Sequence, residues 1–411
     1  MEQVEIAVIG AGVVGLSIAL RLASEGREVV VIDPAEPGSG ASWGNAGTIA
    51  DYAVHPVGSP DVLRALPSLL FDRDSPLAIR RAALPALAPW LLRFARQSLP
   101  AATRRNTLAI AALMSTALSD WEALSAEVGG ESLMQRRGCL YLYETAEGAA
   151  KARKDLAFRR DLGISVELLT PAEIAAMEPG LPPLAGGAAF FPDAVFLSDP
   201  GQMVSRIAAR AMALGVRHLR LRVDRLRRQP GAVQVEGPGL SLRAARVVIA
   251  AGAHSRALAR QAGDRVPLDT ERGYHVEWDM ETPRLTRPAC PTARGFYLCP
   301  MAGRLRVAGT VELGGLTAPP SPHRIARLVE GARAIFPDLP EPDRDWMGFR
   351  PSMPDSLPVI GPSRAGDEIL HAYGHGHVGL TLAPVTARLI ADIIAGREVS
   401  AMMAPCLPDR F

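Results

Sequence analysis

The sequence predicts an α/β protein with a discontinuous nucleotide-binding domain and a second α+β domain built on an antiparallel or mixed sheet. The first observation is a strand, a glycine-rich turn, a helix and a second strand within residues 4–33, which form the βαβ unit that begins a parallel sheet. The second is that α/β pieces recur near 196–250 and 368–395. The third is a pattern typical of antiparallel strands at 266–312.

The individual elements follow from periodicity and from helix and strand breakers. The first helix runs from about Val13 to Ser24 and ends at Gly26, and the second strand ends at Asp33. Residues 34–60 are rich in Gly, Ser and Pro and are expected to be loop. The other expected elements are helices within 61–127 and at 171–178, 200–214, 322–335 and 384–395, and strands at 138–143, 216–224, 232–236, 246–250 and 368–373. This order assigns 1–55, 196–265 and 350–411 to the nucleotide-binding domain, and 56–195 and 266–349 to the second domain.

Composition narrows the class of protein. A net charge of +2 with 21% charged residues gives no reason to expect a nucleic acid partner. The four cysteines have no regular spacing, which argues against a disulfide framework or a zinc site and favours the cytoplasm. We expect neither a membrane span nor a secretory signal, because no sufficiently long apolar run and no cleavage pattern are found.

The turn after the first strand carries the pattern GxGxxG, formed by Gly10-Ala11-Gly12-Val13-Val14-Gly15. In this pattern the first glycine permits the tight turn, the second lets backbone approach a pyrophosphate, and the third lets helix and strand pack closely. The helix N-terminus then stabilises the phosphates. Asp33 can bind ribose hydroxyls, which argues against NADP. The motif predicts a bound dinucleotide and leaves FAD and NAD open.

Four further motifs lie along the chain: Ser42-Trp43-Gly44-Asn45-Ala46-Gly47, Val247-Val248-Ile249-Ala250-Ala251-Gly252, Trp346-Met347-Gly348-Phe349-Arg350-Pro351 and Gly374-His375-Gly376-His377-Val378-Gly379. Together with the helical segment from Asp51 to about Trp121, they resemble the D-amino-acid oxidase/dehydrogenase superfamily of FAD enzymes over nearly the whole chain. The most similar members are the bacterial D-amino acid dehydrogenases.

The resemblance implies that the dinucleotide is FAD. It places a loop with Ser42, Asn45, Ala46 and Gly47 beside the flavin, and the end of a strand, at Ala251 and Gly252, beside the cofactor. It also places the backbone of Val223 at the adenine. It further implies a turn with N–H groups that face the flavin pyrimidine, and the residues of this turn are Gly376, His377, Val378, Gly379, Leu380 and Thr381. The G-x-R-P element has no Cys and the S-W-G-N-A-G loop has no His, so non-covalent FAD is expected.

The resemblance also implies roles for four side chains. Arg350 binds the substrate carboxylate, for which a planar, permanently charged guanidinium is suited. Tyr274 donates its hydroxyl to the same carboxylate, with a tyrosine on the sheet face as the alternative. His377 and His55 line the substrate pocket, with packed or solvated histidines as the alternative. His275 should point away from Tyr274 because side chains alternate along a strand.

We therefore expect an FAD-dependent dehydrogenase that oxidises a neutral D-amino acid or cyclic D-imino acid, of the D-alanine or D-proline/D-hydroxyproline type. Its electrons would pass to a quinone or an electron-transfer protein. A glycine/sarcosine-type oxidase, a flavin-binding subunit of a larger dehydrogenase and a nicotinamide-linked enzyme are the alternatives. No metal is expected, because His375 and His377 lack a suitable spacing. The stretch 61–105 could contact the inner face of the cytoplasmic membrane, or form packed helices with a solvated basic face.

Overall fold

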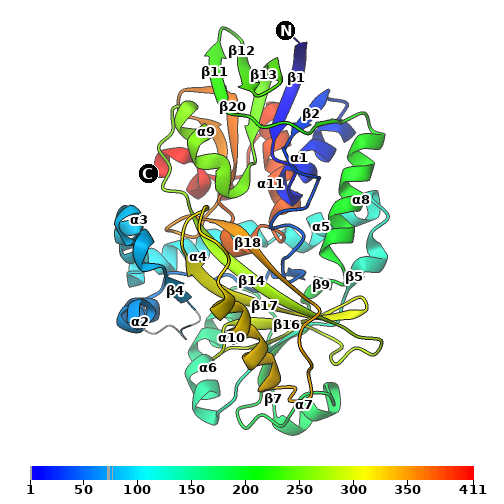
Figure 1. Ribbon diagram of the computed structural model, residues 1–411, viewed down its shortest axis with the longest axis vertical. Helices are drawn as coiled ribbons and strands as arrows, with labels where there is room; N and C mark the ends of the chain where they lie inside the picture. The colour runs from blue at the N-terminus through cyan, green and yellow to red at the C-terminus, as the bar shows by residue number, and fades with distance from the viewer. Residues whose placement is uncertain (1, 72–74, 76) are drawn as a thin grey trace.

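The computed structural model describes residues 2–71, 75 and 77–411 (Figure 1), so positions 72–74 and 76 of the predicted helical stretch lie outside the described residues. Two large sheets dominate the described part, one near each end of the long axis. Their arrangement is the mixed α/β fold predicted from the sequence. The predicted fold class is confirmed.

The first sheet contains the predicted βαβ unit. Its strands run in the order β10-β2-β1-β13-β12-β11, and β20 pairs with β13 and β19. The pairs β10–β2, β2–β1, β1–β13 and β13–β20 are parallel. The strands are β1 (Glu2–Ile9), β2 (Val29–Ile32), β10 (Arg217–Leu219), β11 (Arg225–Gln229), β12 (Ala232–Gly237), β13 (Leu240–Ile249), β19 (Val359–Ser363) and β20 (Gly366–Tyr373).

Helices cover both faces of this sheet. Alternate residues of β1 enter different hydrophobic clusters, with Ile6 and Val8 in one and Ala7 and Ile9 in the other. The Ile6 cluster includes residues of α1 (Val13–Ser24), α8 (Pro200–Ala213) and α11 (Ala383–Ile394), whereas the Ala7 cluster includes residues of α9 (Ser255–Gln261). The central strands are therefore buried on both sides, as parallel sheets usually are.

The second sheet is mixed and has the order β18-β14-β17-β16-β15-β6-β8-β7, with β4 paired to β17. Its strands are β4 (Leu77–Ile79), β6 (Cys139–Leu142), β7 (Glu167–Leu169), β8 (Ala188–Phe191), β14 (Asp269–Asp279), β15 (Ala289–Pro291), β16 (Phe296–Met301), β17 (Arg304–Leu313) and β18 (Arg344–Ser352). Helix α10 (Pro322–Arg333) packs on one face, where Leu328 joins the cluster of Val276 and Trp278. The opposite face carries the side chains of the candidate site.

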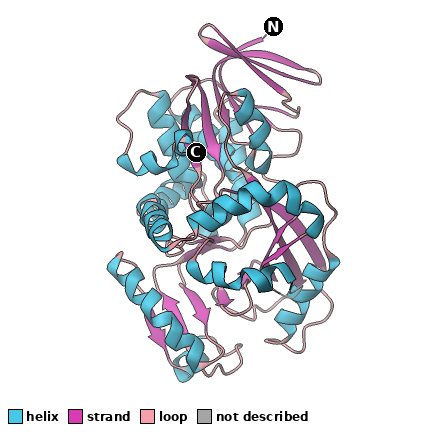
Figure 2. Cartoon of the chain, turned by 90° about the vertical axis from the view of Figure 1, so that its left-hand side faces the viewer, coloured by secondary structure: helices cyan, strands magenta, loops and turns pink. Residues whose placement is uncertain are grey.

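A small third sheet and further helices complete the fold. A small sheet consists of β3 (Thr48–Ile49), β9 (Val195–Leu197) and β5 (Met134–Gln135). The other helices are α2 (Pro60–Phe71), α3 (Leu84–Gln97), α4 (Pro100–Met114), α5 (Ala117–Glu127), α6 (Ala146–Asp161) and α7 (Pro171–Met177). Figure 2 shows helices crossing the middle of the molecule, below the strands that project at the top. No helix among the described residues is both long enough and apolar enough to cross a bilayer.

Candidate cofactor and substrate site

The glycine-rich turn is packed directly against the end of β13. Gly10 has a φ of +113°, and a Cβ added to it would lie 2.4 Å from the carbonyl oxygen of Ala250. A Cβ on Gly15 would lie 2.0 Å from the carbonyl oxygen of Gly10. Both positions therefore need glycine, for conformation or for close packing. The contact places Ala251 and Gly252, which follow β13, beside the turn.

The N-terminus of α1 offers a donor set that fits a pyrophosphate. Gly12 is the N-cap and has no side-chain capping bond, while the N–H of Val13 donates to Ser42 Oγ at 2.8 Å. Asp33 follows β2, and its Oδ2 accepts from the N–H of Ala11 at 2.8 Å. A helix start whose N-cap carries no side chain, with a hydroxyl and a carboxylate nearby, suits phosphates and a ribose. Val223 lies in the segment between β10 and β11 and packs against the hydrophobic cluster that contains Ala7 and Ile9 of β1.

The predicted flavin loop is held by its own asparagine. Asn45 donates through Nδ2 to the Ser42 carbonyl at 2.6 Å, and its Oδ1 accepts from the N–H of Gly47 at 2.7 Å. A Cβ on Gly44 would lie 2.4 Å from the ring of Trp346, so the backbone of the loop lies directly against this side chain of β18. The S-W-G-N-A-G loop is thus in direct contact with Trp346, the first residue of the motif at 346–351, although the two motifs are far apart in sequence.

The turn at 376–381 contacts the segment that follows this loop and β3, and it also contacts α5. The N–H of Ala50 donates to Thr381 Oγ1 at 3.0 Å, and Trp121 of α5 donates to the carbonyl of Leu380 at 3.0 Å. Gly376–Val378 form a 3-10 helix, and α11 begins only at Ala383. The amides expected to face the flavin therefore belong to a 3-10 helix and the turn after it, and they precede the N-terminus of α11.

Arg350 lies on β18 with its guanidinium against the backbone of β14. A Cβ on Gly273 would lie 2.3 Å from Arg350 Cζ. Nη1 of Arg350 donates to the Thr310 carbonyl at 3.0 Å, and no carboxylate of the described residues lies within 4.0 Å of the guanidinium. Burial lowers the pKa of Arg350, whereas the charge of Glu271 acts to raise it. A cation that is held by backbone and has no direct ion-pair partner is suited to an anionic ligand.

Tyr274 does not join Arg350, and its predicted role is corrected. Its hydroxyl donates to Glu312 Oε2 at 2.7 Å and accepts from the N–H of Ser321 at 3.2 Å. Successive residues of β14 point to opposite faces of the sheet, so Tyr274 faces α10 while Gly273 lies under Arg350. As expected, His275 points away from Tyr274, and its Nδ1 lies 2.9 Å from the carbonyl oxygen of Gly44.

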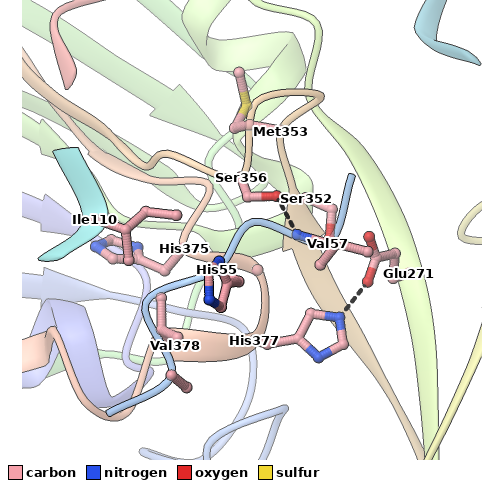
Figure 3. Close-up of a pocket in the computed structure, with 12 residues that line it drawn as sticks. His55, Val57, Ile110, Glu271, Ser352, Met353, Ser356, His375, His377 and Val378 are labelled. Carbon is pink, nitrogen blue, oxygen red and sulfur yellow. Dashed lines mark hydrogen bonds and ion pairs between the residues drawn. The ribbon is translucent and has the colours of Figure 1, made fainter. Parts of the chain in front are cut away.

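His377 lines a pocket together with a carboxylate that sequence reasoning missed. Nε2 of His377 lies 2.5 Å from Oε2 of Glu271, a buried residue of β14 (Figure 3). The residues lining this pocket are Ala53, His55, Val57, Ile110, Glu271, Ser352, Met353, Ser356, His375, Gly376, His377 and Val378. Glu271 lies two residues before Gly273 and therefore on the same face of β14, but only the pairing of β14 with β18 shows that this face holds Arg350.

His55 and His375 are engaged by neighbouring elements. Nε2 of His55 lies 2.5 Å from Oδ1 of Asp155 on α6. Although burial acts to raise it, the pKa of Asp155 is lowered to about 2 by His55 and Arg159. Burial lowers the pKa of His375 to about 4, and its Nε2 lies 2.9 Å from Thr386 Oγ1 on α11. No group of three or more metal-ligating side chains occurs among the residues that the structure describes.

Comparison with known proteins agrees with this arrangement. The chain matches the family described as "DAO: FAD dependent oxidoreductase" over residues 5–393. It is 35% identical to a D-amino-acid oxidase of Bradyrhizobium diazoefficiens, across 100% of this chain and 99% of the relative. It is 32% identical to D-amino acid dehydrogenase 2 of Ralstonia nicotianae, across 98% of this chain and 99% of the relative.

Solved structures of amino acid oxidases and dehydrogenases share the fold of this chain. Glycine oxidase from Geobacillus kaustophilus superposes with a TM-score of 0.78 at 26% identity, and the match covers 100% of both chains. An L-proline dehydrogenase from P. horikoshii has a TM-score of 0.77 at 21% identity, covering 100% of this chain and 98% of that one, which shows a shared fold alone. The glycine turn, the packed flavin loop and these matches together show that the chain belongs to the DAO family of FAD-dependent oxidoreductases.

Proposed function

We propose that this enzyme is a dehydrogenase that oxidises a neutral D-amino acid or a cyclic D-imino acid, of the D-alanine or D-proline/D-hydroxyproline type. Two of its relatives are named for D-amino acids, as an oxidase and as a dehydrogenase. The observation that carries the proposal is Arg350, whose guanidinium rests on Gly273 with no carboxylate of the described residues in direct contact. In this proposal the substrate carboxylate is the ion-pair partner of Arg350.

The chain's own residues hold and orient the substrate. Arg350 binds the carboxylate bidentately, and its bond to the Thr310 carbonyl fixes the direction of the fork. The loop at 42–47 and the turn at 376–381 form the flavin side of the site. When bound, FAD supplies the acceptor for the hydride from Cα. Holding the two reactants in a fixed geometry supplies a large part of the rate enhancement in such reactions.

The stereochemical part of the proposal has a direct test. The carboxylate site and the flavin face fix two points and the side-chain pocket supplies a third, so only one enantiomer can present its Cα–H to the flavin. Anaerobic stopped-flow mixing with D- and L-alanine and with D- and L-proline measures the bleaching of the flavin band. We expect faster bleaching by the D enantiomers. Faster bleaching by the L enantiomers would overturn the stereochemical assignment.

An oxygen-using amino acid oxidase, including the glycine/sarcosine type, is a second candidate, favoured by the relative named as an oxidase and by the match to glycine oxidase. The two candidates differ in what reoxidises the reduced flavin. Reoxidation rates with oxygen and with a soluble quinone, measured after anaerobic reduction, discriminate between them. We expect the quinone to react faster. Stoichiometric peroxide release with no quinone reduction would favour the oxidase.

We further propose that FAD is held without a covalent bond. The contacts would come from Gly10, Gly12, Gly15, Asp33 and the backbone around Val223, together with the loop and turn described above. The geometry supports this because the amides at the start of α1 adjoin the Ser42 hydroxyl. Acid precipitation tests it. The yellow colour should stay in the supernatant, and a coloured pellet would contradict non-covalent binding.

We also propose a peripheral membrane contact through α3 and the start of α4. Residues 75–119 contain six arginines and no acidic residue. Leu92 and Leu99 are 74% and 50% exposed on this segment. Exposed leucines beside arginines suit an anionic lipid surface. Leu92→Ser should weaken co-sedimentation with anionic vesicles, whereas Leu168→Ser, a change at another exposed leucine, should not. Equal effects of both variants would contradict a specific surface.

A further inference from the structure

The candidate site places an anion next to the cation that binds the substrate carboxylate. Glu271 and Arg350 are register partners on the paired strands β14 and β18. The Glu271 carboxylate does not come within 4.0 Å of the guanidinium and instead contacts His377. An α-amino acid carries a carboxylate and an ammonium group on one carbon. A site for it therefore benefits from a positive and a negative group side by side, and these two residues provide them.

We propose that Glu271 and His377 form a proton-accepting pair for the substrate ammonium group. In this pair His377 takes the proton at Nδ1, and Glu271 is a positioning residue that holds the ring through Nε2. The inference rests on the proposed oxidation of an amino acid, because hydride release from Cα requires a neutral amine. It adds a residue, Glu271, and a proton path to that function.

The contacts of the pair favour this division of roles. Glu271 is 3% exposed, and its Oε2 lies 2.5 Å from Nε2 of His377. Although burial acts to raise it, the pKa of Glu271 is lowered by His377 and Arg350. A carboxylate that stays ionised keeps the ring proton on Nε2 and leaves the Nδ1 lone pair free. No described residue hydrogen-bonds to Nδ1, and the side chain of His377 is 38% exposed at the pocket.

The surrounding charged groups do not compete for this proton. His375 stays neutral near pH 7, because burial lowers its pKa to about 4. His55, from the loop after β3, is paired with Asp155. Arg350 carries a permanent positive charge, and Ser352 and Ser356 on the pocket wall are uncharged.

The proposed step balances in atoms and charge. One N–H bond of the ammonium breaks, and its electron pair stays on the nitrogen. The proton forms a bond to Nδ1 of His377, and the resulting imidazolium lies beside the carboxylate of Glu271. The proton then leaves to solvent through the accessible side of the ring. The neutral amine remains on the substrate, whose carboxylate is still held by Arg350.

The test compares the reductive half-reaction of Glu271→Gln and His377→Gln with that of the wild type between pH 6.5 and 10. Below the pKa of the substrate ammonium, both variants should reduce their flavin on the order of 10²-fold more slowly, as expected for loss of a general base. Near pH 10 the substrate is already neutral, so the rates should converge. Tyr274→Phe, a change on the opposite face of β14, should keep the wild-type pH profile.

A second measurement separates positioning from damage to the fold. A carboxylate ligand without an amine, such as benzoate, should perturb the flavin spectrum of Glu271→Gln with a Kd no weaker than that of the wild type, because Arg350 is intact and a nearby negative charge is removed. A rate loss of equal size at every pH, or no loss at pH 7, would overturn the pair. If Glu271→Gln fails to fold, the more exposed His377→Gln still decides the question. Failure of every D-amino acid to bleach the wild-type flavin would instead reject the proposed function.

Discussion

At the scale of single residues, the candidate site depends on a position that has no side chain. The guanidinium of Arg350 occupies the space where a Cβ of residue 273 would stand, 2.3 Å from Cζ. Gly273→Ala must therefore displace the guanidinium, because a backbone strand cannot retreat as easily as a side chain. We expect a large rise in substrate KM with normal FAD content. Steady-state kinetics and the ratio of flavin absorbance to protein absorbance check this together.

The geometry of the guanidinium leads to a second prediction. Arg350→Lys keeps the charge, but an ammonium cannot make two parallel bonds to a carboxylate or reproduce the bond to Thr310. We expect kcat/KM to fall by about 2–4 kcal/mol of transition-state stabilisation, the range for hydrogen-bonded charge pairs. Kinetics of Arg350→Lys close to those of the wild type would remove Arg350 from the proposed site.

The role of a residue could be predicted where a local motif determines it. It could not be predicted where it depends on which face of a sheet the side chain occupies. The glycines of the first turn follow from their spacing. The expected place of Ala251 beside the cofactor comes from the family resemblance, and the structure packs Ala251 against the turn. The role of Tyr274 failed because the strand's two faces were not assigned, and the same gap hid Glu271. Both assignments need the register of β14 against β18, which a single sequence does not specify.

At the scale of elements, β18 is one of several strands that the sequence did not predict, and it is the one that carries Arg350. Its segment contains Gly348 and Pro351, which normally argue against a strand. The structure explains this, because β18 forms the end of the second sheet in its strand order and has a ladder partner, β14, on one side only. A proline is tolerated at such an edge. By contrast, α1 was predicted with its observed bounds, since its periodicity and its glycines are local signals.

The packing of the flavin loop on β18 can be tested with a pair of glycine variants. A Cβ on Gly44 would lie 2.4 Å from the ring of Trp346, whereas a Cβ on Gly40, in the same loop, would meet nothing within 4 Å. We expect Gly44→Ala to weaken FAD binding and Gly40→Ala to leave it unchanged. Titration of apo-protein with FAD measures both Kd values. Similar affinities in the two variants would show that the loop can shift without cost.

At the scale of the whole molecule, the large sheets use different parts of the chain, and β18 crosses the predicted boundary at residue 350. The division into two domains stays a prediction. The sequence could identify the parallel sheet because its βαβ unit is local. It could not give the order of the mixed sheet, where β6 of the first half pairs with β15 of the second. That pairing joins segments far apart in the chain and has no local signature.

Buried histidines give the folded molecule a predictable dependence on pH. Burial lowers the pKa of His375 to about 4, from an unfolded value of about 6.5. The folded state therefore binds this proton later than the unfolded state as pH falls. The stability due to neutral His375 is present above pH 6.5 and is lost as pH falls towards 4, by up to about 3 kcal/mol.

Urea unfolding of the wild type and of His375→Gln at pH 7.5 and 4.5 isolates this contribution. His275, whose pKa is also lowered to about 4 by burial and by Arg306, is present in both proteins and cancels in the comparison. We expect the wild type to lose more unfolding free energy than the variant between the two pH values. Equal losses would show that His375 does not titrate as its burial implies.

The packing of Trp346 on Gly44 should also allow cofactor binding to be followed by tryptophan fluorescence. The ring centroid of Trp346 lies 6.4 Å from that of Trp43 and 5.1 Å from that of His275, so one of the five tryptophans belongs to the loop at 42–47 and a second packs against it. Indole emission overlaps the near-ultraviolet absorption band of flavins, and energy transfer between the two falls steeply with distance. The emission of this pair should therefore be dim in the loaded protein and bright in the empty one. The intrinsic tryptophan fluorescence of the protein should therefore report how much of it has FAD bound, without an added label.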